Sequence, residues 1–151
     1  MNQFIMTLLV AMLPVVELRG AIPYGIVVGL APWPTFLAAV IGNMIPVPFI
    51  LMLIRKIFEW LRAFPWWREK IDLLEKHAHL KGRVVHKYRT LGLLILVAIP
   101  LPGTGAWTGS LVASILDIRL KTAVPTIFTG VVIAGIITML VTFGVGTLFG
   151  V

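Results

Sequence analysis

Hydrophobic positions fill four long stretches of the chain, and two of them are unbroken enough to predict transmembrane helices. Residues 35–54 form a run of 20 residues without a charge, and residues 122–149 form a longer one. At 1.5 Å per residue, a 20-residue helix crosses the hydrocarbon core of roughly 30 Å. Prolines within such spans are tolerated because neighbouring helices satisfy the freed carbonyls. We therefore expect transmembrane helices at 35–54 and 122–149.

The other two apolar stretches are interrupted near their centres. Residues 4–30 are broken by a Pro- and Gly-containing segment at 14–23, and residues 91–116 by a similar segment at 100–109. Each break leaves apolar arms of about 10 residues, which are too short to cross a bilayer alone. This pattern favours two re-entrant hairpins, although periodicity alone also fits two kinked full spans.

The distribution of charge favours the hairpins. Of 19 charged residues, 14 lie in 55–89, ten of them basic. The positive-inside rule makes this segment cytoplasmic, and its pattern predicts two amphipathic helices broken at Pro65. With re-entrant hairpins, Arg119 and Lys121 fall on the same cytoplasmic side and both termini are external. Four full spans would place these two residues outside.

Composition supports a multi-pass protein of the inner or plasma membrane. The chain is 59% hydrophobic and 13% charged, about half the usual charged share. The net charge of +7 lies beside apolar segments, so it predicts contact with lipid headgroups and no nucleic acid. There is no cysteine, and the histidines at 77, 79 and 86 do not have metal-ligand spacing. We expect no metal, no cofactor and no enzymatic activity.

The two halves of the chain follow the same order of elements. Gly20-Ala21 and Gly105-Ala106 lie 85 residues apart, and each pair precedes a short apolar arm, a turn and a full helix. One span separates the halves, so they are inverted, as in many transporters. The expected fold is an all-α integral membrane protein, a single domain over 1–151 with two inverted repeats joined by the amphipathic cytoplasmic segment 55–89. Since two spans enclose little space, a two-fold homodimer is expected.

Glu17 and Arg19 are the only charges in the first 54 residues, and both lie in the first break. Charges at membrane depth normally face a partner or a water-filled cavity. Glu17 is the candidate proton-coupling group, and the planar fork of Arg19 suits a phosphate or carboxylate. The structural alternative is that the two side chains neutralise each other or cap half-helices.

The second break contains no charge. A half-helix beginning near Gly105 would present free N–H groups to an anion, with hydroxyls from two threonines and a tryptophan lining the cavity. Tight packing of the glycines explains the same residues equally well. The candidate substrate-binding residues of both breaks are Arg19, Gly20, Pro23, Pro102, Gly103, Thr104, Gly105, Trp107 and Thr108.

The two breaks, LPVVELRGAIP at 13–23 and PLPGTGAWTG at 100–109, resemble those of the small multidrug export protein family, along nearly the whole chain. That family resembles in turn the DedA/VTT superfamily of re-entrant-loop membrane proteins. The resemblance implies a lipid carrier for cargo such as undecaprenyl phosphate, coupled to an ion gradient, with Glu17 matching the acidic residue of the first loop. The second motif lacks the arginines of the DedA pattern.

Three functions follow from these observations. The leading one is a transporter of an amphiphilic or lipid-phosphate cargo, coupled to protons at Glu17. The first alternative is efflux of small molecules, including cations and drugs, by the same carboxylate. The second alternative is a structural membrane protein that transports nothing.

Overall fold

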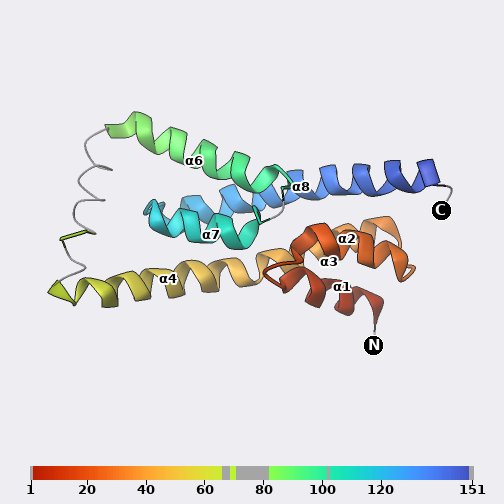
Figure 1. Cartoon of the computed structure of the whole chain (residues 1–151), viewed down its shortest axis with the longest axis horizontal. Coiled ribbons are helices and arrows are strands. Elements are labelled where there is room, and N and C mark those ends of the chain that lie inside the picture. The colour runs from red at the N-terminus through yellow and green to blue at the C-terminus, as the bar shows by residue number, and fades with distance from the viewer. Residues whose placement is uncertain (1, 66–68, 71–81, 102, 150–151) are drawn as a thin grey trace.

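The computed structural model describes residues 2–65, 69–70, 82–101 and 103–149. Within them the secondary structure is helical, and seven helices define the architecture (Figure 1). They are α1 (Gln3–Met12), α2 (Glu17–Val27), α3 (Pro32–Met44), α4 (Pro46–Arg62), α6 (Gly82–Ala98), α7 (Ala106–Ile115) and α8 (Leu120–Phe149).

Two helices are long and apolar enough to cross a membrane. One is the nearly continuous pair α3–α4, over Pro32–Leu61, and the other is Leu120–Gly144 within α8. At 1.5 Å per residue these are about 45 Å and 37 Å long. The expected span at 122–149 lies inside α8 but ends beyond Gly144. The expected span at 35–54 lies inside the α3–α4 pair, which continues farther in both directions. Lys and Arg at a helix end do not stop it, because their side chains reach water along the helix surface.

The remaining helices form two helical hairpins that point toward each other. The turn between α1 and α2 and the turn between α6 and α7 both lie near the middle of the molecule (Figure 1). The beginning of α1 and the end of α8 lie at one end, and the end of α4 and the beginning of α6 lie at the other. Helices α1, α2 and α7 have 10, 11 and 10 residues. Each is therefore about 15–17 Å long, half of a bilayer core.

The breaks are narrower than the sequence suggested. In the first hairpin the chain leaves helical geometry only at 13–16, and α2 begins at Glu17 and contains Pro23. In the second, the described residues outside α6 and α7 are 99–101 and 103–105, whereas the sequence suggested a break over 100–109. Gly and Pro weaken an isolated helix, but packing against neighbouring helices maintains α2 and α7 through these residues.

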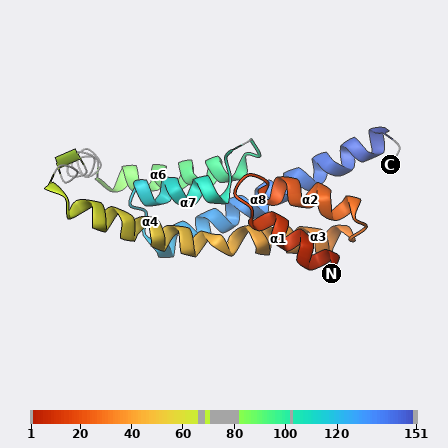
Figure 2. The ribbon, with the colours of Figure 1, turned by 60° about the horizontal axis from the view of Figure 1, so that its bottom comes forward.

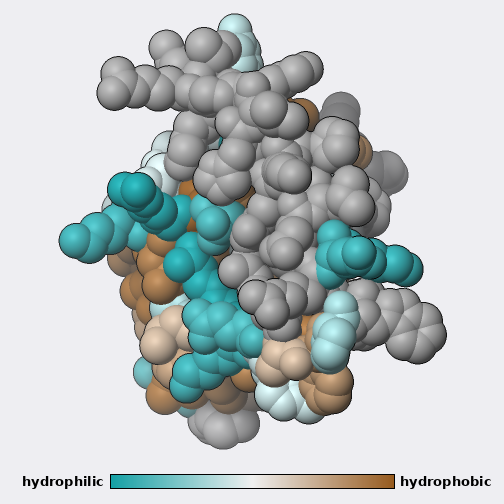
Figure 3. All heavy atoms as spheres, turned by 90° about the vertical axis from the view of Figure 1, so that its left-hand side faces the viewer, coloured by the Kyte–Doolittle hydropathy of each residue, from teal (hydrophilic) through white to brown (hydrophobic). Residues whose placement is uncertain are grey.

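The predicted connector 55–89 is also divided differently. Residues 55–62 belong to α4, and residues 82–89 belong to α6, which begins nine residues before the expected start of the second hairpin at 91. The second of the two expected amphipathic helices falls largely on 66–68 and 71–81, outside the described residues, as do His77 and His79. Hydrophilic side chains gather on the end of the molecule where α4 ends and α6 begins (Figure 3).

Two clusters of buried side chains form the core, one around each hairpin. The first joins α1, α2, α3 and α8 through residues such as Ala11, Leu18 and Ala39. The second joins α3, α4, α6, α7 and α8 and includes Val47 and Leu93. Helix α8 runs past both hairpins in both ribbon views (Figure 2). The two long helices thus hold the hairpins in place.

The turns after α2 and α7 have the same backbone geometry. Gly29 and Asp117 both adopt a positive φ, of 84° and 51°. Each turn makes the same three hydrogen bonds, which close a Schellman cap. The bonded pairs are Val28 N–Tyr24 O, Gly29 N–Ile26 O and Leu30 N–Gly25 O in one turn, and Leu116 N–Val112 O, Asp117 N–Ser114 O and Ile118 N–Ala113 O in the other.

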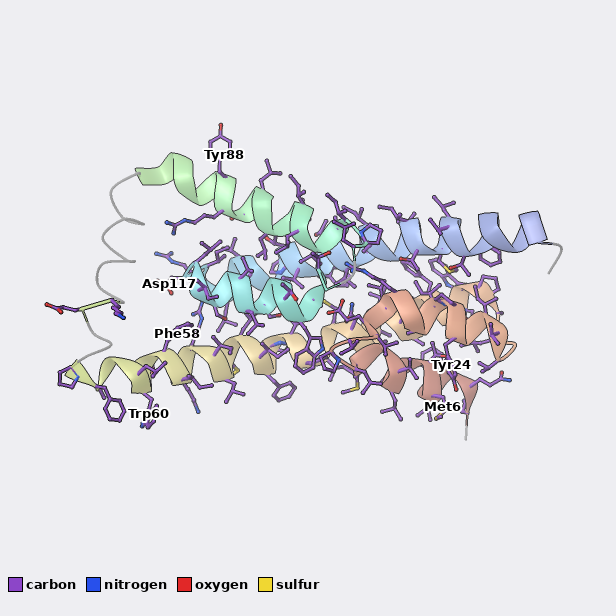
Figure 4. All side chains as sticks on the ribbon, in the orientation of Figure 1. Met6, Tyr24, Phe58, Trp60, Tyr88 and Asp117 are labelled. Atoms are coloured by element: carbon purple, nitrogen blue, oxygen red, sulfur yellow. The ribbon has the colours of Figure 1, made fainter. Side chains whose placement is uncertain are left out.

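Two arginines stabilise the second of these turns. Arg55 of α4 donates through Nη2 to the Ile118 carbonyl, and Arg89 of α6 donates through Nη1 to the Leu116 carbonyl at 3.2 Å. Cations near a helix C-terminus also complement its dipole. Asp117 lies at this turn, whereas Trp60 and Tyr88 point outward from α4 and α6 (Figure 4).

Candidate functional site at the hairpin tips

The tips of the two hairpins contact each other at the centre of the molecule. We call residues 13–16 the first tip and residues 99–105 the second tip. The indole Nε1 of Trp107, just after the second tip, donates to the carbonyl of Met12, just before the first tip, at 3.2 Å. The hydrogen bond joins residues 95 positions apart in the sequence. The two predicted breaks therefore form one site.

Glu17 lies at the centre of this contact. It is the first residue of α2, its φ is 49°, and only 6% of its surface is exposed. Left-handed backbone is uncommon for residues other than glycine and often occurs at functional sites. Its Oε1 accepts a hydrogen bond from the backbone N–H of Trp107 at 3.3 Å. The carboxylate of Glu17, which directly follows the first tip, thus lies at the first turn of α7.

Gly105 provides the space for that carboxylate. A Cβ at position 105 would overlap the carboxyl group of Glu17, so a side chain cannot be added there without displacing Glu17. The carboxylate occupies the N-terminus of α7, where free N–H groups and the helix dipole favour negative charge. The anion position predicted for the second break is therefore filled by the chain's own Glu17.

Arg19 binds the second tip by a separate set of contacts. Its Nη2 donates to the Ile99 carbonyl and to Thr104 Oγ1, both at 3.2 Å. The Thr104 hydroxyl also lies 3.0 Å from the Leu101 carbonyl and so links the two ends of the tip. The Nε of Arg19 is buried and has no hydrogen-bond partner among the described residues.

Glu17 and Arg19 do not form a salt bridge with each other in the described structure. Each instead contacts the second tip, Glu17 at the beginning of α7 and Arg19 at Ile99 and Thr104. Of the two structural alternatives raised above, capping describes the geometry of Glu17, and mutual neutralisation by direct pairing does not occur. The spacing of two residues places the side chains on different helix faces, which explains the division.

The other candidate residues fall into two groups. Thr108 donates to the Gly103 carbonyl at 2.7 Å, and Gly103, with φ 80°, makes the turn of the second tip. Gly20 and Pro23 lie within α2 and have no described contact with the second tip. Pro102 lies outside the described residues.

Three polar groups were missed from the sequence: two that are partners of the site residues and one further buried side chain. Two are backbone carbonyls, of Met12 and Ile99, which leave no signal in the residue type. The third is Asn43, fully buried in α3, whose Nδ2 and Oδ1 have no partner among the described residues. Its signal was available, because Asn43 is the one amide side chain after Gln3 and lies in an uncharged membrane segment.

The fold and this site define a helical membrane protein with a buried carboxylate between two helical hairpins. The chain belongs to the family described as "Putative small multi-drug export protein", whose model matches residues 17–137. No curated protein and no solved structure matches the chain. The family name indicates a transporter rather than an enzyme, and it favours the efflux alternative over a lipid-phosphate carrier.

Proposed function

We propose that the protein exports small amphiphilic molecules across the membrane in exchange for protons, with Glu17 as the proton-exchanging group. The observation that carries the proposal is the buried carboxylate of Glu17, held between the two hairpin tips by Trp107 N–H and Gly105. A carboxylate buried at membrane depth marks a pathway for ions or substrate more often than a structural contact.

The proposed membrane arrangement has both hairpins re-entrant. Helices α1, α2 and α7 are too short to cross, and the two tips meet midway along the long helices. Irregular backbone at that depth is stable when it is buried in protein or lines a cavity. The positive charge near the end of α4 and the beginning of α6 supports a topology with that end in the cytoplasm and both termini outside.

The two Schellman caps support an inverted repeat with a revised register. Gly29 and Asp117 occupy equivalent turn positions 88 residues apart, rather than the 85 suggested by the Gly-Ala pairs. A shift of 88 pairs Glu17 with Gly105, so the carboxylate of one repeat occupies the space left by the missing side chain of the other. In this proposal a two-fold homodimer of such repeats forms the working unit, because two spans and two hairpins enclose little space on their own.

Protonation of Glu17 provides the coupling step. The ionised carboxylate accepts the Trp107 N–H and caps α7. A protonated carboxyl group is a weaker acceptor and loses its attraction to the helix dipole, so the tips separate more easily. A cationic cargo instead pairs with the carboxylate only after its proton has left, so each bound state excludes the other. Cargo and proton thereby compete for one group, which is the requirement for exchange.

A second candidate cargo is an anionic lipid headgroup, such as a polyprenyl phosphate. One observation favours it: the buried Nε–H of Arg19 has no partner among the described residues and can donate to a phosphate. The other contacts of Arg19 are already made within the second tip, and Glu17 fills the α7 N-terminus. Because Arg19 is already engaged and Glu17 occupies the anion position, a cation is the first candidate cargo.

The test uses proteoliposomes with an acidic lumen and ethidium outside. Ethidium is permanently charged, so a pH gradient alone does not trap it. Proton exchange predicts accumulation of ethidium that collapses when the gradient is dissipated, and no effect of added undecaprenyl phosphate. Lack of accumulation above empty liposomes would contradict export of cations. Competition by undecaprenyl phosphate would favour the lipid cargo.

A further inference from the structure

The strongest unexplained feature outside the Glu17 contact is the side chain of Asn43. It is completely buried, and neither Nδ2 nor Oδ1 has a hydrogen-bond partner among the described residues. An amide carries two N–H donors and an oxygen with two lone pairs. More than nine in ten buried polar groups in proteins are paired, so an unpaired one requires an explanation. Binding of a ligand at this position is such an explanation.

The backbone around Asn43 adds further acceptors. Asn43 lies at the end of α3, just before the junction with α4 at Ile45. Position 46 and position 48 are prolines, which have no N–H, so the carbonyls of Gly42 and Met44 have no donor four residues later. The freed carbonyls flank Asn43 on both sides in the chain. Apart from the N–H groups of the Asn43 amide, the junction therefore offers more acceptors than donors.

The packing of its neighbours places Asn43 near the hairpin tips. Val40 and Val47 lie three residues before and four residues after Asn43, and so share its helix face. Both belong to the buried cluster that contains Ala106, the first residue of α7. Ala106 lies between Gly105 and Trp107, which hold the Glu17 carboxylate. The face that carries Asn43 thus belongs to the same buried cluster as the first residue of α7.

We propose that Asn43 and the open backbone at the α3–α4 junction bind the hydrogen-bond-donating head of the cargo, and that this head is a primary ammonium. The inference rests on the proposed function. A primary ammonium has three N–H donors for these acceptors and a positive charge that complements Glu17. A quaternary ammonium has the same charge and no donor. The site therefore discriminates between amines of equal charge by their N–H groups.

The experiment compares octylamine, protonated at neutral pH, with octyltrimethylammonium. Binding is measured by calorimetry with the protein in lipid nanodiscs, and the heat of empty nanodiscs is subtracted. Wild type is expected to prefer octylamine. Asn43→Leu should weaken octylamine binding about tenfold and leave octyltrimethylammonium binding unchanged. Asn43→Asp keeps the acceptor oxygens and should retain the preference.

Thr35→Val is the matched control. Thr35 is also fully buried in α3, but its hydroxyl already donates to the Ala31 carbonyl at 2.9 Å, one turn from the start of the helix. This variant should keep the wild-type preference. The melting temperature gives a second readout. Because the Asn43 amide has no partner in the part of the chain that the structure describes, Asn43→Leu should melt at or above wild type.

Three results would overturn the inference. One is equal affinity of wild type for the two amphiphiles, and another is an unchanged preference in Asn43→Leu. A third is a lower melting temperature of Asn43→Leu with loss of both ligands, which would make Asn43 a structural residue. If wild type binds neither amphiphile, the proposed export of cations fails as well. If wild type binds both amphiphiles with equal affinity, the role of Asn43 fails but the proposed export of cations does not.

Discussion

The carboxylate of Glu17 accepts a hydrogen bond from the backbone N–H of Trp107 at 3.3 Å, across 90 residues of sequence. The contact joins the first turn of α2, the second helix of one hairpin, to the first turn of α7, the second helix of the other. It places a group that can exchange a proton where movement of either hairpin would break its hydrogen bond. The proposed proton exchange depends on this contact.

Replacing Gly105 tests the space around the carboxylate. Gly105→Ala should displace Glu17, because the added Cβ overlaps its carboxyl group. We expect a loss of stability of about 1–3 kcal/mol, typical of overpacking, and loss of ethidium uptake. Thermal unfolding and proteoliposome uptake measure the two effects.

Gly92→Ala is the control for that variant. Gly92 lies within α6, and a Cβ there would meet nothing within 4 Å. Alanine should stabilise the helix by about 0.5–1 kcal/mol and leave uptake intact. Equal behaviour of the two alanine variants would show that the space at Gly105 does not matter.

A double-mutant cycle tests which partner Arg19 has. The hydrogen bond to Thr104 predicts a coupling of about 0.5–1.5 kcal/mol between Arg19→Gln and Thr104→Val. Glu17→Gln and Arg19→Gln should show weaker coupling, since no salt bridge joins the two side chains in the described structure. Unfolding free energies of the single and double variants give both values. Strong coupling between Glu17 and Arg19, without coupling between Arg19 and Thr104, would indicate a buried ion pair and contradict the described contacts.

Arg55 should be more important for stability than its neighbour Lys56. Arg55 donates to the Ile118 carbonyl in the turn after α7, whereas Lys56 is exposed. We expect Arg55→Met to cost about 1–2 kcal/mol and Lys56→Met less than about 0.5 kcal/mol. The two melting temperatures in the same detergent provide the comparison, and similar values would exclude a stabilising role for the Arg55 contact.

Cysteine labelling tests the proposed topology directly, because the chain has no cysteine of its own. Ala31 and Lys121 are both exposed. Ala31 lies just before α3, and Lys121 lies in the first turn of α8. Re-entrant hairpins place Ala31→Cys outside and Lys121→Cys in the cytoplasm. An impermeant thiol reagent should therefore label only the first in intact cells. Labelling of both from outside would indicate four full spans.

The helical fold and the positions of the two breaks were readable from the sequence for physical reasons. Long uncharged runs predict the two long helices, and isolated charges within an apolar segment mark Glu17 and Arg19. The limits of the breaks were not readable. Pro23 and Thr108 lie inside helices because tertiary packing compensates for residues that weaken an isolated helix.

The partners of the site residues were also beyond the sequence. Glu17 and Arg19 are neighbours in the chain, and direct pairing was one expectation. The structure divides them between Trp107 and Thr104, because residues two apart point to different sides of a helix. The register proposed for the repeat, 88 residues, differs by three from the 85 expected from the sequence for a similar reason. Matching Gly-Ala pairs align residue types, whereas the two caps align backbone geometry.

The most direct test of proton exchange at Glu17 is ethidium uptake by Glu17→Gln in vesicles with an acidic lumen. Glutamine keeps the shape and an oxygen acceptor for Trp107 N–H but cannot exchange a proton. Glu59→Gln, at an exposed position of α4, is the control. The account predicts that Glu17→Gln folds as wild type does and shows no gradient-driven uptake, while Glu59→Gln transports normally. Gradient-driven uptake at the wild-type rate by Glu17→Gln would contradict it.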